Sequence, residues 1–468
     1  MSSGPEIEGL KSAGAVLLVS CYELGHQPLS LASPLAVLRR AGYDAAAVDT
    51  AVESLDEATV ARARFVGVAV PMHTALRLGV EVAARVRAIN PECHVAFYGL
   101  YAALNSEYLL RHGVDSCIGG EYETPLLALV EAIGEGADLD LAGVIRCGHR
   151  SAPALNRVDF AVPARDDLPP LDEYASLQHR GGLHTAGYTE ASRGCLHLCT
   201  HCPIPPIYAG RLFTVPVDVV VQDVAQQVEA GAKHITFGDP DFLNGPTHSL
   251  RVVRAVHEEF PQLTFDFTAK IQHLLERGES LPEFAESGCL FVISAVESLS
   301  ERVLSILQKR HTRSDADLAL AHCRRAGIAL RPTWVAFTPW TTRDDFLEIL
   351  DFVEANDLIG HVDSIQYAIR LLIPPGSLLA GLPETQEHIL DLDEAGFTYR
   401  WNHPDPAMDE LQREVASLVA RDLEHEVEPA DTFYRICDLA RGDNAASRRA
   451  ATRPQPSPSP RMTEPWFC

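Results

Sequence analysis

Three cysteines in one short stretch constrain this chain more than any other feature of its sequence. Cys195, Cys199 and Cys202 form a CxxxCxxC array, and a proline-rich run at residues 203–206 follows it. Three thiolates this close in sequence can bind a single inorganic centre. A structural zinc site takes four protein ligands, and a four-iron cluster is usually held by four as well. Because no fourth cysteine lies nearby, one iron of a cluster bound here would be free to take another ligand.

A zinc site is the alternative interpretation of the same array. His197 or His201 would then supply the fourth ligand, as in a zinc knuckle. The flanking sequence argues against this interpretation, because it does not resemble that of a small zinc module. A zinc-binding protein without enzymatic activity nevertheless stays open as an alternative function.

The composition excludes several other classes of protein. The chain has 468 residues, of which 46% are hydrophobic and 22% charged, enough for two or three globular domains. Its net charge of −25 argues against a nucleic-acid partner, since such binding needs a positive surface. No apolar run is long enough to span a membrane, and residues 1–8 lack the basic start of a secretory signal.

The remaining cysteines indicate a reducing compartment. Most of the eleven lie singly in apolar segments, as buried free thiols do: Cys93, Cys117, Cys289 and Cys323 are examples. A disulfide framework is not expected in a chain of this size without a signal peptide. We therefore expect a cytoplasmic protein, a location that also suits an oxygen-sensitive cluster.

Residues 1–147 alternate short apolar runs with amphipathic stretches. The expected strands are 15–20, 45–49, 65–70, 94–98 and 116–118, and the expected helices lie near 30–41, 54–63, 73–89, 103–112 and 124–134. Continuously apolar strands separated by helices predict a parallel sheet covered on both faces. The fold class is therefore α/β, beginning with a doubly wound domain of the flavodoxin or Rossmann kind. Ligands of such domains bind outside the carboxyl ends of the strands.

A second α/β unit follows a connector at residues 148–185 that is rich in proline and aspartate. Within 186–377 we expect a strand before Cys195 and five more at 233–237, 263–268, 290–293, 328–335 and 365–369. Six β/α units predict a partial barrel with its chemistry at the carboxyl ends of the strands. Residues 378–440 are expected to cap the barrel, and 441–468 to form a low-complexity tail without stable structure.

With these patterns around it, the array and the preceding Arg193 and Gly194 resemble the signature of radical S-adenosylmethionine (SAM) enzymes. The resemblance implies a [4Fe–4S] cluster on the three cysteines, with SAM chelating the fourth iron. It places His201 near the adenine of SAM, and Gly238 and Asp239 near its amino group, where a carboxylate suits an ammonium. Ser294 and Glu297 are expected at the ribose or the carboxylate of SAM. Other polar residues at the barrel mouth are Lys270, which is expected near SAM, Arg370, which is expected near substrate, Arg331 and Thr333.

The N-terminal third resembles the cobalamin-binding domain that precedes the barrel in many radical SAM proteins. Gly99 follows the fourth strand, and Gly119, Gly120 and Glu121 follow the fifth, where the family holds the corrin. Glycine at such positions lets the backbone approach a flat macrocycle. The DxHxxG motif is absent and His26 does not have its spacing, so we expect no histidine beneath the cobalt. A related domain with an empty pocket is the alternative.

The end of the sequence carries a shorter resemblance. Residues 462–468 look like the start of the tail in CUAEP/CCAEP-tail radical SAM proteins, as if a selenocysteine codon after Cys468 had been read as a stop. Cys468 is then a candidate catalytic thiol, suited to redox work or to holding a soft atom such as arsenic or selenium. The other interpretation is a terminus with one incidental cysteine.

These resemblances imply reductive cleavage of SAM and radical chemistry on a small molecule or peptide. With cobalamin, methyl transfer is the commonest outcome in the family, and an electron donor of flavodoxin or ferredoxin type is implied. One alternative is a radical SAM enzyme without functional cobalamin that transfers another fragment of SAM. A tRNA methylthiotransferase would need a further cysteine set and a basic RNA-binding domain, and neither is visible.

Overall fold

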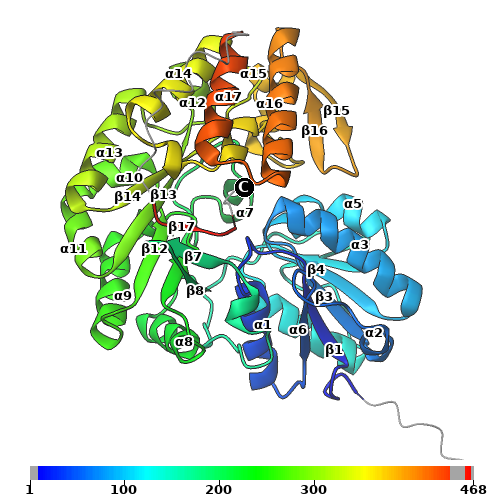
Figure 1. The fold of residues 1–468 in the computed structure, drawn as a ribbon. Helices are drawn as coiled ribbons and strands as arrows, with labels where there is room; N and C mark the ends of the chain where they lie inside the picture. The colour runs from blue at the N-terminus through cyan, green and yellow to red at the C-terminus, as the bar shows by residue number, and fades with distance from the viewer. Residues whose placement is uncertain (1–8, 443–458, 465–468) are drawn as a thin grey trace, which may run out of the picture.

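The computed structural model describes residues 9–442 and 459–464. The candidate thiol Cys468 lies outside these residues. Two α/β domains lie side by side, and a C-terminal region packs on both of them (Figure 1). Within the described residues, no helix combines the length and the apolar character that a membrane span requires.

The N-terminal domain has the predicted doubly wound fold. Its sheet has the order β2-β1-β3-β4-β5-β6, and all pairs are parallel except the last. The strands are β1 (Val16–Ser20), β2 (Ala46–Asp49), β3 (Phe65–Ala69), β4 (His94–Tyr98), β5 (Ser116–Ile118) and β6 (Val144–Arg146). The helices are α1 (Leu29–Arg40), α2 (Glu57–Arg62), α3 (His73–Ile89), α4 (Leu100–Leu104), α5 (Ser106–Arg111) and α6 (Glu123–Glu135).

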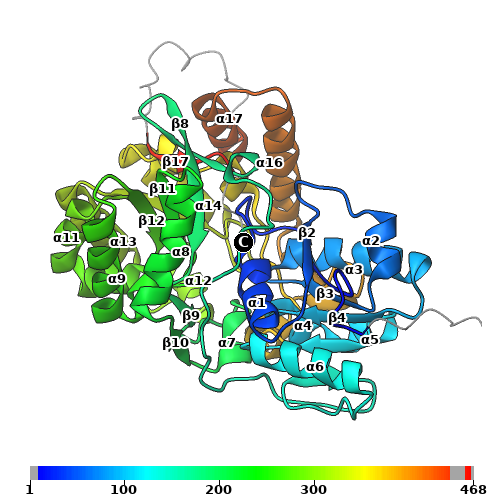
Figure 2. The ribbon, with the colours of Figure 1, turned by 90° about the horizontal axis from the view of Figure 1, so that it is seen from below.

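Both faces of this sheet are buried, which explains why its strands are apolar throughout. Leu17 and Leu18 are adjacent in β1, yet they belong to different hydrophobic clusters because successive side chains point to opposite faces. Helices α1 and α6 cover one face, and α2, α3 and α5 cover the other. Helix α1 also faces the second domain (Figure 2).

The second domain is a curled sheet, with the order β14-β13-β12-β11-β8-β7-β17 in the described part of the chain. Its parallel strands are β8 (Gly182–Thr189), β11 (His234–Phe237), β12 (Thr264–Thr268), β13 (Cys289–Glu297) and β14 (Ala329–Trp334). Strand β7 (Ser176–His179) pairs antiparallel with β8. The outer face carries α8 (Val217–Glu229), α9 (Pro246–Glu259), α10 (Ile271–Glu276), α11 (Leu281–Glu286), α13 (Arg313–Ala326) and α14 (Arg343–Ala355), while α12 (Glu301–Ile306) follows β13.

The prediction of a sixth barrel strand at residues 365–369 is wrong. This segment is the 3-10 helix η5 (Ser364–Ala368). The side chain of Gln366 accepts a hydrogen bond from Trp334 N at 3.0 Å, so a side chain meets the β14 backbone where a strand would pair. Pairing occurs only beyond the helix, where Phe337 donates to Ile369 O and accepts from Leu371 N.

The C-terminal region contacts both domains. It contains the hairpin β15 (Ile389–Asp393) and β16 (Thr398–Trp401), then α16 (Pro406–Glu424) and α17 (Pro429–Arg441). Both helices pack on the barrel core, as Val415 and Phe433 show. The hairpin tip reaches the other domain, because Phe397 joins a hydrophobic cluster of the N-terminal sheet and Gly396 O contacts His73 Nε2 at 2.8 Å.

The predicted tail without stable structure does not hold for residues 459–464. They contain β17 (Arg461–Met462), which pairs antiparallel with β7. The composition of 441–458, rich in Ala, Arg, Ser and Pro, hid this short strand from the sequence analysis.

Candidate functional site

The three cysteines lie in a loop that leaves the barrel mouth and turns back on itself. Strand β9 (Ser192–Gly194) precedes the loop and pairs antiparallel with β10 (Leu212–Thr214), and α7 (Ile204–Tyr208) lies between them in sequence. Gly194 has a φ of +76°, and a Cβ there would lie 2.4 Å from Arg211 O. Only glycine satisfies both constraints, so Gly194 fixes the start of the loop.

Hydrogen-bond donors surround the cysteine sulfurs. Cys195 Sγ accepts from Asn244 Nδ2 at 3.4 Å and from the backbone of His197 at 3.5 Å. Cys199 Sγ lies 3.6 Å from Lys270 Nζ. Burial raises the pKa of the Cys202 thiol to about 12, so a bound metal is needed to keep that sulfur as a thiolate. Three thiols with amide and ammonium donors fit an anionic iron–sulfur cluster.

His201, Glu297 and Lys309 form an ion-pair group next to the cysteines. Glu297 Oε1 lies 3.2 Å from both Lys309 Nζ and His201 Nε2. Burial alone would raise the pKa of Glu297, but these two partners outweigh it and lower the pKa to about 2. The Glu297 oxygen expected to bind SAM is thus engaged. His201 Nδ1 is buried and has no hydrogen-bond partner among the described residues, so it is the ring atom open to a ligand.

The other residues predicted to bind SAM lie at the strand ends, but protein groups occupy their polar atoms. Asp239 accepts from Ala191 N at 2.9 Å and from Ser192 Oγ at 2.5 Å, and burial raises the pKa of Asp239 to about 7. Ser294 Oγ donates to a backbone carbonyl of the barrel at 2.7 Å. A Cβ at Gly238 would overlap the ring of Tyr188. These residues position the loops of the mouth.

Three further polar candidates lie on or after the last strands of the barrel. Two of them are paired with carboxylates of the protein, and the third is not. Arg331 Nη2 pairs with Asp363 at 3.1 Å. Arg370 pairs with Asp409 at 2.6 Å and stacks on Trp401, so it fastens the C-terminal cap. Thr333 Oγ1 is buried without a hydrogen-bond partner among the described residues, which leaves it open to a ligand.

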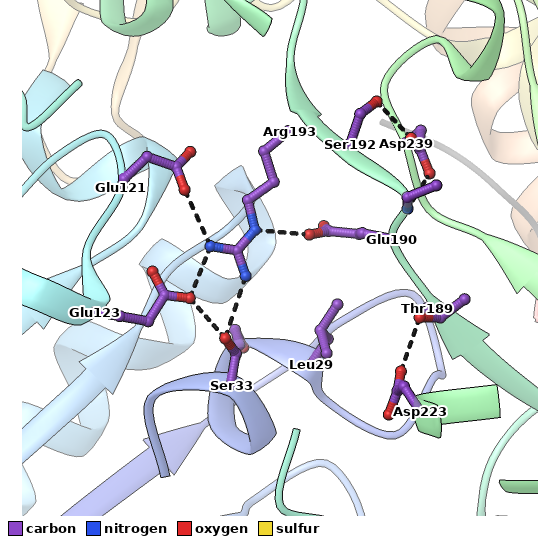
Figure 3. A network of polar contacts seen from close by, with 12 residues as sticks. Leu29, Ser33, Glu121, Glu123, Thr189, Glu190, Ser192, Arg193, Asp223 and Asp239 are labelled. Atoms are coloured by element: carbon purple, nitrogen blue, oxygen red, sulfur yellow. Dashed lines mark hydrogen bonds and ion pairs between the residues drawn. The ribbon is translucent and has the colours of Figure 1, made fainter. Parts of the chain in front are cut away.

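Arg193 connects the cysteine loop to the N-terminal domain (Figure 3). Its guanidinium lies 2.7 Å from Glu123 Oε1 and 3.2 Å from Glu121 Oε2, both in the segment after β5. It also lies 3.0 Å from Glu190 Oε2 and 3.3 Å from Ser33 Oγ. One side chain, two residues before the first cysteine, therefore fixes the two domains relative to each other.

This network holds three carboxylates around one guanidinium: Glu121 and Glu123 are buried, and Glu190 is partly exposed. Burial raises the pKa of Glu121 and of Glu190, since a charged carboxylate loses its hydration there. Tyr208 donates to Glu121 Oε1 at 2.9 Å, which adds α7 to the network. Arg193, Glu190 and Ser33 line a small cleft between the domains. Without Arg193, three carboxylates would lie together with no cation to offset them.

A second arginine repeats this connection from the linker. Arg165 forms a bidentate pair with Asp223 on α8, with distances of 2.6 and 2.9 Å. It also donates to Gln27 Oε1 at 2.8 Å and to Tyr188 O at 2.7 Å. Arg165 thus joins a loop of the N-terminal domain to the first parallel barrel strand.

The glycines expected to hold a corrin are packed against the protein itself. A Cβ at Gly99 would lie 3.2 Å from the Val70 carbonyl, and one at Gly119 would lie 2.5 Å from Ala103 Cβ. A Cβ at Gly120 would lie 2.3 Å from a backbone oxygen of the linker. Their missing side chains therefore allow close packing of loops. A corrin at this sheet edge would have to contact other atoms of the loops.

His197 and His201, the histidines considered as a fourth zinc ligand, contact other side chains. Nε2 of His197 lies 3.3 Å from His273 Nε2 and 3.6 Å from Asp241, and His273 Nδ1 lies 2.8 Å from Asp241 Oδ2. Nε2 of His201 contacts Glu297. A four-ligand zinc site on the cysteines would have to break one of these contacts.

The sequence analysis missed Lys309, Asn244 and the acidic partners of Arg193. Lys309 follows α12 and Asn244 ends a short 3-10 helix, so neither stands directly after a parallel strand. Glu121 was expected at cobalamin, whereas the structure places it on Arg193. Long-range pairings of this kind leave no periodic signal in the sequence.

A comparison with known families decides what kind of domain holds this site. Residues 189–353 match the Radical SAM superfamily. The chain contains a radical SAM domain. The match includes the cysteine loop and strands β11 to β14. The resemblance of residues 462–468 to the CUAEP/CCAEP tail stays a prediction.

Relatives align over more of the chain than the radical SAM domain. An uncharacterized methyltransferase of Pyrococcus horikoshii is 23% identical over 74% of this chain and 76% of its own length. The hopanoid C-3 methylase of Methylococcus capsulatus is 24% identical over 67% of this chain and 62% of its own length. These relatives support an enzyme with methyltransferase-type chemistry.

Two solved structures share the fold over most of this chain. The cobalamin-dependent radical SAM enzyme OxsB has a TM-score of 0.70, with 16% identity over 87% of this chain and 67% of that one. The radical SAM methyltransferase TsrM from Kitasatospora setae has a TM-score of 0.63, with 20% identity over 73% of this chain and 71% of that one. At these identities the likeness establishes the fold. OxsB was solved with aqua-cobalamin and SAM, and TsrM with cobalamin and a [4Fe–4S] cluster.

We expect Arg193→Met to lower the free energy of unfolding by about 3–5 kcal/mol, because it leaves buried carboxylates without their cation. Urea denaturation at pH 7.5 measures the loss. The loss of unfolding free energy should be smaller near pH 5, because protonation of the glutamates then reduces the repulsion between their carboxylates. The matched control is Arg211→Met, at an exposed position on the same hairpin, with an expected change below about 0.5 kcal/mol. A loss at Arg193 no larger than this control would contradict the role assigned to the network.

His26 should make stability depend on pH. It is stacked on Tyr188 with ring centroids 4.7 Å apart, and burial lowers its pKa from 6.5 to about 4. The folded state therefore binds fewer protons between these values, so its stability is complete above pH 6.5 and falls towards pH 4. Removing the titrating ring by His26→Phe should reduce this slope by up to about 1.4 kcal/mol per pH unit.

The measurement is urea denaturation at several pH values between 4 and 7. The control variant is His112→Phe, which changes an exposed histidine of the same domain and should keep the wild-type slope. An identical pH profile for wild type and His26→Phe would mean that His26 does not titrate across the unfolding transition.

Proposed function

We propose that this protein is a cobalamin-dependent radical SAM methyltransferase acting on a small molecule or peptide. The observation that carries the proposal is the cysteine loop, which offers three thiols and their donors at the boundary of a flavodoxin-like domain. The radical SAM match and the methyltransferase relatives support the same reaction type.

The residues around the loop suit a negatively charged centre. Cys195, Cys199 and Cys202 would hold the cluster, while Lys270 and Lys309 offset its charge. The chemistry supplied by a cluster with SAM is one-electron cleavage of a carbon–sulfur bond, and cobalamin adds the transfer of a methyl group. The part of the protein is to orient these groups and to exclude water, and the burial of Cys195 and Cys199 serves the second task.

The outer side of the cysteine loop suits an electron donor. Leu196 and Leu198 lie between the cysteines in sequence and are 51% and 46% exposed. Apolar side chains at such a position favour contact with another protein. A flavodoxin or ferredoxin bound to these two leucines would contact residues that are adjacent in sequence to the cluster ligands Cys195 and Cys199.

Cobalamin is proposed for the space at the carboxyl ends of β1, β4 and β5. The strand order and the likeness to OxsB and TsrM support this position. His26 is stacked on Tyr188, and the proposal includes no histidine bound to the cobalt. Glu121 and Glu123 would keep the loop after β5 attached to the cysteine loop while the corrin is bound.

The packing of Gly99, Gly119 and Gly120 favours a second candidate. In that case the N-terminal domain binds no corrin, and the protein is a radical SAM enzyme that transfers another fragment of SAM or acts on a soft element such as arsenic or selenium. The two candidates share the cluster; they differ in the reaction and in cobalamin content, and the cobalamin content can be measured directly.

Anaerobic reconstitution with iron, sulfide and hydroxocobalamin tests the proposal. We expect about four irons per chain, an EPR signal after reduction that changes when SAM is added, and one cobalamin. Mutating Cys195, Cys199 and Cys202 together to alanine should abolish the cluster, whereas Cys147→Ala, an exposed cysteine outside the loop, should leave it intact. A cluster without cobalamin would favour the second candidate. Zinc in place of iron would overturn both.

A further inference from the structure

The curled sheet of the barrel leaves an opening between its two outer strands. Of the strands before residue 459, β14 ends the sheet on one side and β7 ends it on the other. Because the predicted sixth strand is a 3-10 helix, no regular strand of residues 9–442 extends β14. A sheet edge without a neighbour exposes backbone groups that can pair with another strand. We call the space between β7 and β14 the seam.

Residues 459–464 lie along β7, as Figure 1 shows, and make hydrogen bonds to both sides of the seam. On one side, Thr463 N donates to Ser176 O at 2.9 Å, and Ser176 N donates to Thr463 Oγ1 at 2.9 Å. On the other side, Arg331 of β14 donates to Pro460 O at 3.4 Å. The segment therefore extends the sheet beyond β7 and is linked to β14 by the Arg331 side chain.

The side chains of β17 alternate as those of a half-buried strand do. Met462 is partly buried and packs against the apolar cluster of Leu177, Phe291 and Ile293. Arg461 points to the other side and bonds Gln178 Oε1 at 2.8 Å on the surface. One side chain packs on an apolar cluster and the next forms a polar bond on the other side, which is how a peptide strand is recognised at a sheet edge.

The far end of the segment reaches the N-terminal domain. Tyr22, just after β1, donates to Glu464 Oε1 at 2.5 Å. A Cβ at Gly25 would lie 2.9 Å from Glu464 Cβ, so glycine makes room for this approach. The segment thus joins β7, β14 and the loop after β1, which are far apart in sequence.

We propose that the seam between β7 and β14 is a binding site for an extended peptide strand, which residues 459–464 occupy as a built-in ligand. The site has the two parts of strand-addition sites, a free backbone edge and an apolar pocket for alternate side chains. Its selectivity comes from the pocket that takes Met462 and from Arg331, which binds a backbone carbonyl. The proposal requires no cofactor and is independent of the reaction.

Hydrogen exchange of the full-length chain tests the occupancy of the seam. Met462→Asp puts a charge into the apolar pocket, which should release the segment. The exchange of the amides of β7, above all Ser176, should then rise at least about tenfold. The matched control Arg461→Gln changes the exposed side of the same strand and should stay within about twofold of wild type. Unchanged exchange in Met462→Asp would overturn the proposal.

A synthetic peptide of residues 459–464, added to the Met462→Asp protein at about 1 mM, tests the seam as a binding site. It should restore the protection of Ser176, and the same peptide with Met462→Asp should not. Equal protection by both peptides, or by neither, contradicts strand recognition.

A cross-link checks the register without depending on that variant. Met462 lies directly opposite Leu177, so the double variant Leu177→Cys with Met462→Cys should form a disulfide under mild oxidation. The out-of-register pair Leu177→Cys with Glu464→Cys should not form one. Mass spectrometry of the digested, unreduced protein separates the two results. Failure of the first pair contradicts the pairing of β17 with β7.

Discussion

A single buried guanidinium organises the centre of this protein. Arg193 lies two residues before the first cysteine and accounts for three carboxylates, two of which belong to the other domain. Such an arrangement costs desolvation, and Coulomb attraction repays it only when the geometry is good. The ion pairs fix the position of the loop after β5 relative to the cysteine loop, so that the two loops form one rigid unit. Chemistry that needs two cofactors at a fixed separation depends on such a unit.

At the barrel mouth, too, polar side chains bond to other groups of the protein and hold loops in place. Asp239, Ser294 and Glu297 stand where the resemblance placed SAM ligands, yet each one bonds to the protein. They shape the loops, whereas His201 Nδ1 and Thr333 Oγ1 are buried and have no hydrogen-bond partner within the part of the chain that the structure describes. A polar residue after a barrel strand can therefore serve the site indirectly, by holding the backbone that a ligand will meet.

Much of the fold could be predicted, because it follows from local patterns. The apolar runs of the first domain predicted the parallel sheet, and the spacing of Cys195, Cys199 and Cys202 predicted the radical SAM loop. The failures concern interactions between distant residues. Residues 365–369 have the composition of a strand, but the bond from Trp334 N to the Gln366 side chain replaces the pairing. Neither the partners of Arg193 nor the docking of Met462 has a local signature, so a single sequence cannot reveal them.

The position of Phe397 has a consequence for how the chain is made. This side chain is only 2% exposed and completes a hydrophobic cluster whose other members all lie in the first 150 residues. During synthesis the part of this cluster that Phe397 covers therefore stays exposed until the hairpin has left the ribosome. Exposed apolar surface on an incomplete chain favours aggregation and the binding of chaperones. The first domain thus receives the last part of its interior only after the barrel has been made.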